Sequence, residues 1–227
     1  MNIKLVVFDM AGTTVDEGNV VYHTLHKAIS LHSIQVSFEE VLIWGAGKEK
    51  LQAIRDILLN CHPQSVSESE IDAIFKTFLL ELDLAYENLL VIPIKNTERL
   101  FKELKELGIK VVLNTGYNRQ TAMSLLKKLS WNEGVEYDLL VTASDVSKNR
   151  PAPDMILLAM NSLQILEGET VIKVGDSVID IEEGKNANCK FSIGITTGAH
   201  TKEQLAAANP SYIIDNIYDI KNIILNA

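Results

Sequence analysis

A stretch near the amino terminus combines a carboxylate with small residues that can form hydrogen bonds. Ile3 to Phe8 is a short apolar run containing Val and Ile, which predicts a buried strand, and Asp9 stands where that strand should end. Ligands of parallel α/β sheets bind at the carboxyl ends of strands, so an aspartate there can act as a nucleophile or a metal ligand. The alternative is an aspartate that only caps the following helix.

Three more segments place polar side chains after expected strands or at the start of expected helices. Thr115 lies in Leu-Asn-Thr-Gly-Tyr, and Arg150 directly precedes Pro-Ala-Pro-Asp. Asp176 and Asp180 lie in Gly-Asp-Ser-Val-Ile-Asp. Thr115 and the backbone N–H groups after it could cradle a phosphate, and Arg150 would supply a fixed positive charge. Asp9 alone would repel a phosphate, but a Mg²⁺ ion bound to both would offset this repulsion, with Asp176 and Asp180 as further ligands. The alternative for these two acids is helix capping.

The hydrophobic periodicity divides the chain into a helical block and an alternating block. Helical spacing dominates from about residue 15 to residue 87, and we expect no strand there. From residue 90 onward, short apolar runs alternate with amphipathic segments, which predicts a parallel sheet with right-handed crossovers. The predicted fold class is therefore α/β, a Rossmann-like parallel-sheet core (residues 1–14 and 88–227) with an inserted α-helical cap domain (residues 15–87). The expected cap helices are Val20–Ser33, Ser37–Ile43, Lys48–Asn60 and Ser67–Asn88, and the expected later strands are Ile109–Leu113, Leu139–Thr142, Val171–Val174, Phe191–Ile195 and Tyr212–Ile214.

In this order the four polar segments resemble the four motifs of the haloacid dehalogenase superfamily, and Ala-Gly-Thr after Asp-Met is most similar to its phosphonatase branch. The resemblance spans the whole chain. It implies that Asp9 is the nucleophile and that Thr115 and Arg150 serve the phosphoryl group. Lys148 competes with Arg150 for the third motif, and we prefer Arg150 because it directly precedes the Pro-Ala-Pro-Asp segment. The implied ligands of Mg²⁺ are Asp9, the backbone carbonyl of Ala11, Asp176 and Asp180.

Ala11 marks a departure from the ordinary phosphatases of this superfamily, which carry a second aspartate two residues after the nucleophile. That aspartate protonates the leaving oxygen and later activates water. Phosphonatases share the alanine, because their leaving group is carbon and a cap lysine forms an imine with the substrate aldehyde. The segment Trp-Gly-Ala-Gly-Lys ending at Lys48 resembles the loop that carries this lysine. Trp44, Leu51 and Asn19 stand where phosphonatases have Met, His and Cys.

Lys48 therefore has three interpretations: an imine-forming nucleophile, a cation that binds phosphate, or a surface lysine. We predict a Mg²⁺-dependent hydrolase that acts on a small phosphonate or phosphate through an aspartyl-phosphate at Asp9. The alternatives are a phosphomonoester phosphatase and, in another class, a phosphoacceptor or ligand-sensing protein with negligible turnover. The residues expected to bind the substrate are Gly12, Gly45, Gly116, Tyr117 and Lys48.

The composition limits the partners of the chain. Its formal net charge is −9 and no segment is basic, so a nucleic acid is not an expected partner. No apolar run approaches the ~20 residues of a membrane span, and because the first strand begins at once we expect a cytoplasmic protein, monomeric or homodimeric. Cys61 and Cys189 lack the spacing of a zinc site or disulfide framework. Packing or exposure is expected for His23, His26 and His32.

Overall fold

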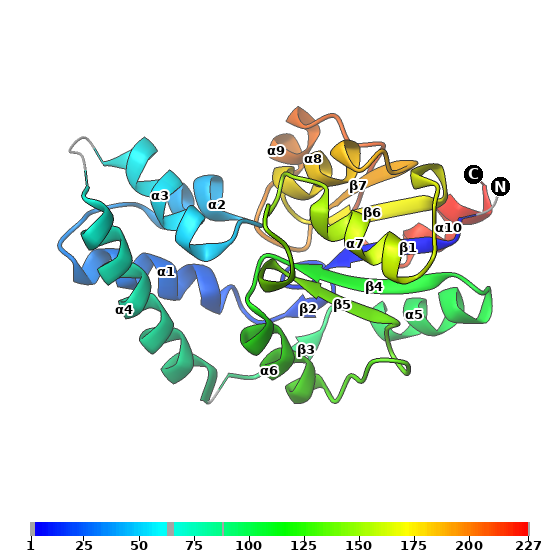
Figure 1. Ribbon diagram of the computed structural model, residues 1–227, viewed down its shortest axis with the longest axis horizontal. Helices are drawn as coiled ribbons and strands as arrows, with labels where there is room; N and C mark the ends of the chain where they lie inside the picture. The colour runs from blue at the N-terminus through cyan, green and yellow to red at the C-terminus, as the bar shows by residue number, and fades with distance from the viewer. Residues whose placement is uncertain (1–2, 63–65, 88, 227) are drawn as a thin grey trace.

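The computed structural model describes residues 3–62, 66–87 and 89–226, and these form an α/β core with a helical cap beside it (Figure 1). Within this part of the chain the main sheet has six parallel strands in the order β5-β4-β1-β6-β7-β8. The predicted fold class is confirmed, although the outermost residues of the predicted domain ranges (1, 88 and 227) lie outside the described residues. The strands are β1 (Leu5–Asp9), β4 (Lys110–Thr115), β5 (Leu139–Thr142), β6 (Val171–Gly175), β7 (Phe191–Ile195) and β8 (Tyr212–Ile214).

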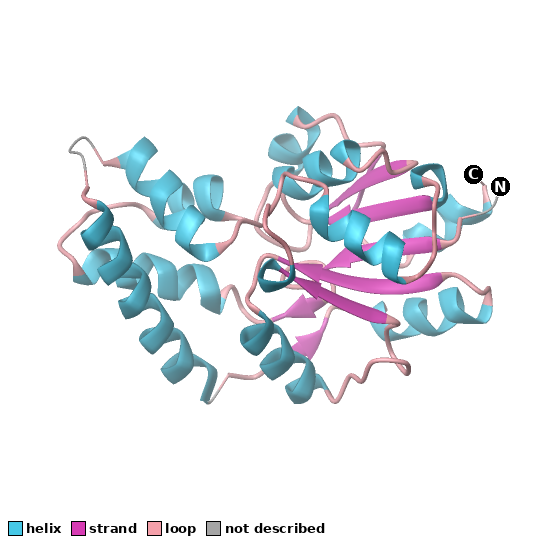
Figure 2. Cartoon of the chain, viewed as in Figure 1, coloured by secondary structure: helices cyan, strands magenta, loops and turns pink. Residues whose placement is uncertain are grey.

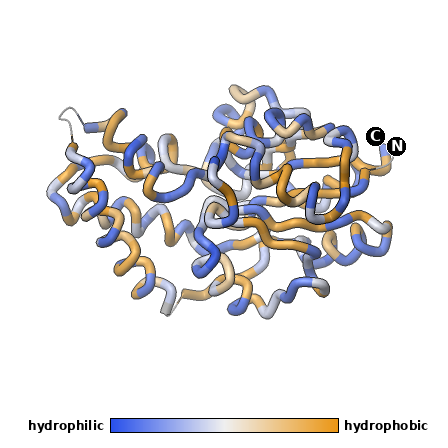
Figure 3. Tube along the Cα trace, in the orientation of Figure 1, coloured by the Kyte–Doolittle hydropathy of each residue, from blue (hydrophilic) through white to orange (hydrophobic). Residues whose placement is uncertain are grey.

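The central strand β1 is buried on both faces, which explains why its sequence is almost continuously apolar (Figure 3). Side chains alternate along a strand. Val6 and Phe8 pack into one apolar cluster, where the ring centroid of Phe8 lies 5.2 Å from that of Phe101. Leu5 and Val7 pack into a second cluster on the opposite face. Because helices cover both faces, the polar carboxyl end of β1 at Asp9 is the part of the strand that remains available for chemistry.

The helices of the core cover both faces of the sheet (Figure 2). The sequence pattern predicts a helix from Pro153 to Leu166, but the helix ends at Ser162, because Gln164 adopts a left-handed backbone conformation (φ 58°). The helices α9 and α10 were not predicted. The core helices are α5 (Thr97–Glu106), α6 (Arg119–Leu129), α7 (Asp154–Ser162), α8 (Val178–Asn186), α9 (Lys202–Ala207) and α10 (Asp219–Leu225), with short 3₁₀ turns at Ala143–Asp145 and Gly168–Thr170.

The cap consists of α1 (Val20–Leu31), α2 (Phe38–Gly45), α3 (Lys50–Cys61) and α4 (Glu68–Glu87), whose buried apolar side chains join one cluster with those on one face of the sheet. Ser37 caps α2, since its hydroxyl accepts from the N–H of Glu40 and the Glu40 carboxylate accepts from the N–H of Ser37. In the part of the chain that the structure describes, no helix combines the length and apolar character needed to cross a membrane.

The two linkers between cap and core pair with each other, which corrects the expectation of no strand in the helical block. β2 (Val15–Asp16) lies antiparallel to β3 (Ile92–Pro93). Each strand has only two residues, too few for an alternating pattern to be recognised in the sequence. This pairing joins the two chain segments that connect the cap to the core. A short two-stranded ribbon therefore holds the cap against the core.

The loop between α2 and α3 touches the core through its backbone. Gly47 has φ 72°, and a Cβ atom there would lie 2.5 Å from Ser177 Oγ and collide with Ile179. A Cβ on Gly116, at the end of β4, would lie only 2.7 Å from the carbonyl oxygen of Gly47. The cap loop therefore fits between two core segments only because these positions lack side chains.

We predict that Gly47→Ala weakens the docking of the cap loop on the core. Left-handed backbone geometry costs alanine about 1–2 kcal/mol, and the collision with Ile179 adds to that cost. Hydrogen exchange of the amides in residues 44–49 should speed up at least ~10-fold, since 1.4 kcal/mol corresponds to a factor of ten. Gly18→Ala is the matched control, because Gly18 also has positive φ but nothing within 4 Å of the added atom. Equal protection of the loop in both variants would contradict the prediction.

Candidate active site

The carboxylate of Asp9 is held by the guanidinium of Arg150. Asp9 is the last residue of β1, and its Oδ1 accepts a hydrogen bond of 2.7 Å from Arg150 Nη1. Both side chains are almost fully buried, at 7% and 1% exposed. Arg150 is thus the cation that the sequence motif assigned to this site, whereas Lys148 is exposed. An arginine fixed beside a buried carboxylate can also meet an incoming phosphoryl group.

A second layer of buried charges fixes Arg150 in turn. Its Nη1 lies 2.9 Å from Asp180 Oδ1, and its Nε donates to Glu183 Oε2 at 2.9 Å. Lys173, in the middle of β6, places its Nζ 3.0 Å from Asp180 Oδ1 and 3.1 Å from Glu183 Oε2. The amide of Asn114 links them, since its oxygen accepts from Lys173 at 2.7 Å. Although burial opposes it, the attraction of Arg150 and Lys173 holds the pKa of Asp180 below its usual value.

Asp176 differs from its neighbours because no basic side chain contacts its carboxylate among the described residues. Its Oδ2 accepts from the N–H of Ala199 at 2.6 Å, and its Oδ1 accepts from the Thr13 hydroxyl at 3.3 Å. Burial, followed by repulsion from Asp9 and Asp180, raises the pKa of Asp176 well above its ordinary value. Burial also raises the pKa of Asp9, to about 6, although Arg150 opposes that rise.

The donor set fits a divalent cation. Ligand atoms of Asp9, Asp176 and Asp180 all lie within 4.8 Å of one another. When all are ionised together with Glu183, these acids would carry four negative charges against the two positive charges of Arg150 and Lys173, so a bound divalent cation would balance the buried group. Hard carboxylate oxygens are the ligands that Mg²⁺ prefers. The chemistry of the cluster therefore matches a bound Mg²⁺ ion.

Close backbone approaches surround Asp176. Gly12 has φ 80°, and a Cβ there would lie 2.5 Å from Asp176 Oδ2. A Cβ on Gly198 would collide with the same carboxylate. Gly12 was expected to bind substrate, and the structure places it against the candidate metal ligand. Gly198 and Ala199, in the loop after β7, were not found from the sequence, because they contact Asp176 only through their backbone.

The end of β4 places polar groups on the other side of Asp9. Asn114 is paired with Asp9 in the register of β1 and β4. Thr115 is buried, and its hydroxyl accepts from the N–H of Tyr117 at 3.2 Å, which leaves the hydroxyl proton for a ligand. Gly116 lies under the cap loop, and Tyr117 is buried beneath the cap. The expected phosphate-binding segment is therefore at the cap–core boundary.

The position of Ala11 holds no acid, but a different buried carboxyl lies in the adjoining linker. Ala11, two residues after Asp9, is 7% exposed. Glu17, which follows β2, is 2% exposed, and its carboxylate accepts from the N–H of Val21 at 3.4 Å. Burial raises the pKa of Glu17 to about 8, so at neutral pH it retains a proton. A lone glutamate in a linker carried no signal in the sequence.

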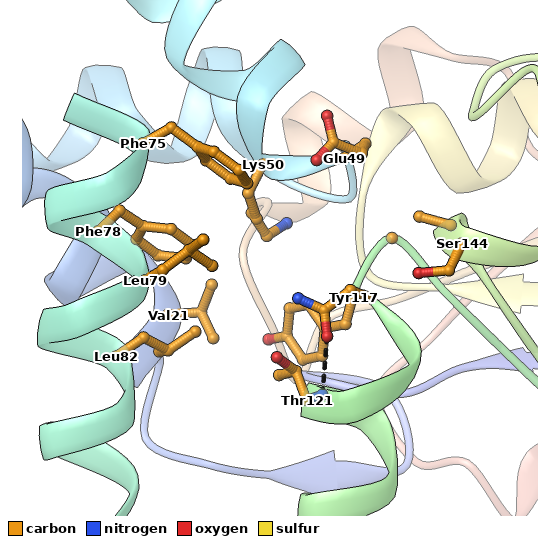
Figure 4. Close-up of a pocket in the computed structure, with 13 residues that line it drawn as sticks. Val21, Glu49, Lys50, Phe75, Phe78, Leu79, Leu82, Tyr117, Thr121 and Ser144 are labelled. Atoms are coloured by element: carbon orange, nitrogen blue, oxygen red, sulfur yellow. Dashed lines mark hydrogen bonds between the residues drawn. The ribbon is translucent and has the colours of Figure 1, made fainter. Parts of the chain in front are cut away.

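Lys48 and Lys50, near the start of α3, have different surroundings. Lys48 forms an ion pair with Asp56, four-fifths buried at its side chain, and lines a polar hollow with Arg150 and Pro151. Lys50, which was not singled out in the sequence, is 6% exposed and points into the space beneath the cap (Figure 4). Its Nζ lies 5.4 Å from the ring centroid of Tyr22 and 5.2 Å from that of Tyr117, and it donates to the Lys48 carbonyl at 2.5 Å.

Burial makes the amine of Lys50 less basic than an ordinary lysine. Removal from water lowers the pKa of Lys50 to about 8, against the opposing attraction of Glu49, Asp9 and other charges. The role of an uncharged amine, expected of Lys48 as one alternative, is therefore better matched by Lys50. Lys48 is instead engaged in an ion pair with Asp56.

Two other groups of predicted residues are placed away from the acidic cluster. Gly45 is the last residue of α2, and a Cβ there would lie 3.2 Å from Ile57 Cδ1, so its small size serves packing inside the cap rather than the expected contact with substrate. The cap histidines pack as expected: the ring of His23 stacks on Phe38, His26 contacts the Val36 carbonyl, and His32 contacts the Thr77 hydroxyl.

Comparisons with known proteins agree with this geometry. The family model of the haloacid dehalogenase-like hydrolases matches residues 6–193. A phosphonoacetaldehyde hydrolase of Bacillus mycoides is 29% identical over 240 aligned residues, covering 98% of this chain and 88% of that protein. The crystal structure of a phosphonoacetaldehyde hydrolase-like protein from Oleispira antarctica superposes with a TM-score of 0.84 at 24% identity, covering all of this chain and 92% of that one. A hydrolase from Pseudomonas syringae gives 0.85 at 17% identity, covering 98% of each chain. The chain belongs to the haloacid dehalogenase-like hydrolases and is an enzyme of that family.

Proposed function

We propose that this hydrolase releases phosphate from a small phosphonate that carries a carbonyl group, through an aspartyl-phosphate at Asp9. The observation that carries the proposal is the position of Asp9: its carboxylate lies beside Asp176 and Asp180 and is held by Arg150. The likeness to phosphonoacetaldehyde hydrolases supports the phosphonate as substrate class. We propose a small-molecule substrate and no nucleic-acid partner, as expected from the sequence.

The residues of the chain suit a transfer of the phosphoryl group to Asp9. Asp9, Asp176, Asp180 and the Ala11 carbonyl would hold Mg²⁺, which when bound supplies the charge that offsets the repulsion between carboxylate and phosphoryl group. Arg150 orients the Asp9 carboxylate, and the Thr115 hydroxyl can donate to a phosphoryl oxygen. The docked cap loop limits the access of water while the group transfers.

A neutral cap amine would make the carbon leaving group possible. The amine attacks the carbonyl carbon of the substrate and, with uptake of a proton and loss of water, forms a protonated imine. When the carbon–phosphorus bond breaks, its electrons pass into the protonated imine and give a neutral enamine, while Asp9 takes the phosphoryl group. The enamine then takes up a proton at carbon, and water hydrolyses the resulting imine and the aspartyl-phosphate. We assign the amine to Lys50, because Lys48 is engaged with Asp56.

Glu17 favours a second candidate function, the hydrolysis of phosphate esters. An alkoxide leaving group needs a proton, and Ala11 cannot give one. Glu17 is buried near Lys50, whose positive charge lowers the pKa of Glu17, and burial still leaves that pKa at about 8. A carboxyl group that retains its proton at neutral pH is suited to act as a general acid.

We predict that Asp9→Asn abolishes phosphate release while leaving the fold intact. Loss of the covalent nucleophile should lower the rate by at least ~10³-fold. Release should also need Mg²⁺, and acetyl phosphate should label a peptide containing Asp9 in mass mapping. The exposed Asp16→Asn is the control for an amide substitution in the same segment. Undiminished turnover in EDTA or in Asp9→Asn would contradict the proposal, and labelling of Asp9 without turnover would instead favour a phosphoacceptor.

Ala11→Asp should add the missing acid and raise the hydrolysis of alkyl phosphates. General acid assistance is worth ~10²–10⁴-fold for a poor leaving group, whereas p-nitrophenolate departs with little help. The gain should therefore be larger for an alkyl phosphate than for p-nitrophenyl phosphate. Ala11→Asn controls for the size of the new side chain. If Ala11→Asp folds normally and shows no gain on alkyl phosphates, another acid already acts, and Glu17→Gln would then be expected to lower that activity.

Borohydride trapping with phosphonoacetaldehyde should give an adduct on Lys50. Lys50→Arg keeps a positive charge but cannot form an imine, so it should lose both the adduct and carbon–phosphorus cleavage, while Lys48→Arg should retain both. Because the ammonium form cannot attack a carbonyl, the rate of imine formation should rise with pH and level off above about 8, the pKa of Lys50. An adduct on Lys48, or unchanged cleavage in Lys50→Arg, would overturn the assignment.

A further inference from the structure

The loop after β7 is hydrogen-bonded to two segments of the candidate site. The Thr197 hydroxyl donates to the Gly12 carbonyl at 2.6 Å. The backbone N–H of Ala199 donates to Asp176 Oδ2 at 2.6 Å, and that of His200 donates to the Asp176 carbonyl at 3.2 Å. The loop ends at His200, whose side chain is 8% exposed. A buried polar ring needs partners for its nitrogen atoms, and the two nitrogens of this ring have different ones.

One ring nitrogen of His200 caps helix α8. The first N–H groups of a helix have no partners within the helix. Ser177 stands at the N-cap position, but its hydroxyl donates to the Asp180 carboxylate and makes no hydrogen bond to the helix backbone. The N–H of Val178 instead donates to His200 Nδ1 at 3.0 Å. Because a backbone N–H can only donate, His200 Nδ1 carries no proton.

The other ring nitrogen of His200 reaches the cap. Its Nε2 lies 3.3 Å from the carbonyl oxygen of Leu42, in α2. A neutral imidazole with no proton on Nδ1 has its proton on Nε2, so Nε2 donates to this carbonyl. The hydrogen bond from Val178 therefore fixes the tautomer that the contact with the cap requires.

The contact at Leu42 lies close to the cap loop that docks on the core. Residues 46–49 follow α2, and the Gly47 carbonyl in this loop accepts from Arg150 Nη1 at 3.3 Å. His200 and Arg150 are thus two core side chains that donate to backbone carbonyls of the same cap segment. Loss of the His200 contact would release the end of α2 and leave the loop tethered through Gly47.

We propose that His200 is a positioning residue that fastens the end of α2 to the core and so sets the docked position of the cap loop. The ring acts through Leu42 and does not touch the reacting atoms. The loop that carries His200 also holds the Asp176 carboxylate, so one short core segment contacts both a candidate metal ligand and the cap. The inference rests on the proposed function for the role of the docked loop in phosphoryl transfer.

The first test uses two amides that each replace one ring nitrogen of His200. The side-chain oxygen of Asn can take the place of Nδ1 and cap α8, but Asn is too short to reach Leu42. The amide nitrogen of Gln can take the place of Nε2 and keep the contact with the cap. One neutral hydrogen bond shifts an equilibrium by about 2- to 10-fold. Hydrogen exchange of the amides in residues 44–49 should therefore be at least ~3-fold faster in His200→Asn and close to the native rate in His200→Gln.

The two variants distinguish docking of the cap from capping of α8. If His200 only caps α8, exchange in residues 44–49 stays slow in His200→Asn and becomes faster in His200→Gln. That order, or equal exchange in the two variants, would overturn the inference. His32→Asn is the matched control, because His32 contacts Thr77 inside the cap and should leave the exchange of residues 44–49 unchanged.

A measurement on the unsubstituted chain does not depend on the folding of the variants. Nitrogen NMR of the ¹⁵N-labelled protein should show His200 with an unprotonated Nδ1 and a protonated Nε2. The Nε2 proton should exchange slowly with water, since the ring is buried and the proton is bonded to the Leu42 carbonyl. A proton on Nδ1, or rapid exchange of the Nε2 proton, would contradict the inference.

Turnover separates this inference from the proposed function. The value of kcat/KM for phosphate release should fall at least ~3-fold in His200→Asn and be restored in His200→Gln. An unchanged kcat/KM in His200→Asn, with release that depends on Asp9, would overturn the positioning role. The expected order of exchange without any Asp9-dependent release would contradict the proposed function alone. Asp9-dependent release with equal exchange in the two variants would contradict the assignment of His200 alone.

Discussion

The burial of negative charge at the carboxyl ends of the parallel strands is the constraint on which the rest of this structure depends. A carboxylate removed from water is unfavourable unless it is paired and hydrogen-bonded. Arg150 meets this need for Asp9, Asp180 and Glu183 at once. Loss of one partner from such a buried pair costs about 3–5 kcal/mol, because the other charge remains uncompensated. Arg150 is therefore as much a condition for folding as a candidate for chemistry.

The same constraint explains a lysine in the middle of the apolar strand β6. Lys173 is completely buried, yet its amine reaches Asp180, Glu183 and Asn114. With Arg150 and Lys173 both engaged, Asp176 still lacks a basic partner at the position where a divalent cation fits. The fold thus neutralises the inner part of the cluster and leaves Asp176 without a compensating cation among the described residues.

The sequence predicted the central residues of the site but not their supports. Asp9, Arg150, Asp176 and Thr115 were found because each follows an apolar run or precedes a recognisable turn, and strand ends meet at one edge of a parallel sheet. Glu183 and Lys173 lie inside regular elements and gave no local signal; only the three-dimensional packing brings them to Arg150. The six parallel strands were all predicted, because buried strands are continuously apolar, whereas the linker strands were too short to be recognised.

The start of α3 lies two residues later than the sequence predicted. The predicted helix began at Lys48, but Glu49 caps α3 by accepting from the N–H groups of Leu51 and Gln52. Glutamate is not among the preferred N-cap residues, so this start was not recognised. Lys48 therefore lies before α3 and pairs with Asp56 of that helix, whereas Lys50, the first residue of α3, is the lysine that is buried under the cap.

The burial of Lys50 depends on the packing of α4 against the start of α3. Phe78 and Leu82 of α4 line the space that also holds the Lys50 side chain. Removal from water lowers the pKa of the amine to about 8, against the attraction of Glu49 and Asp9. An amine that must be uncharged to react therefore depends on neighbouring side chains that keep water away from it, and in this cap the proposed reactivity of Lys50 would follow from that packing.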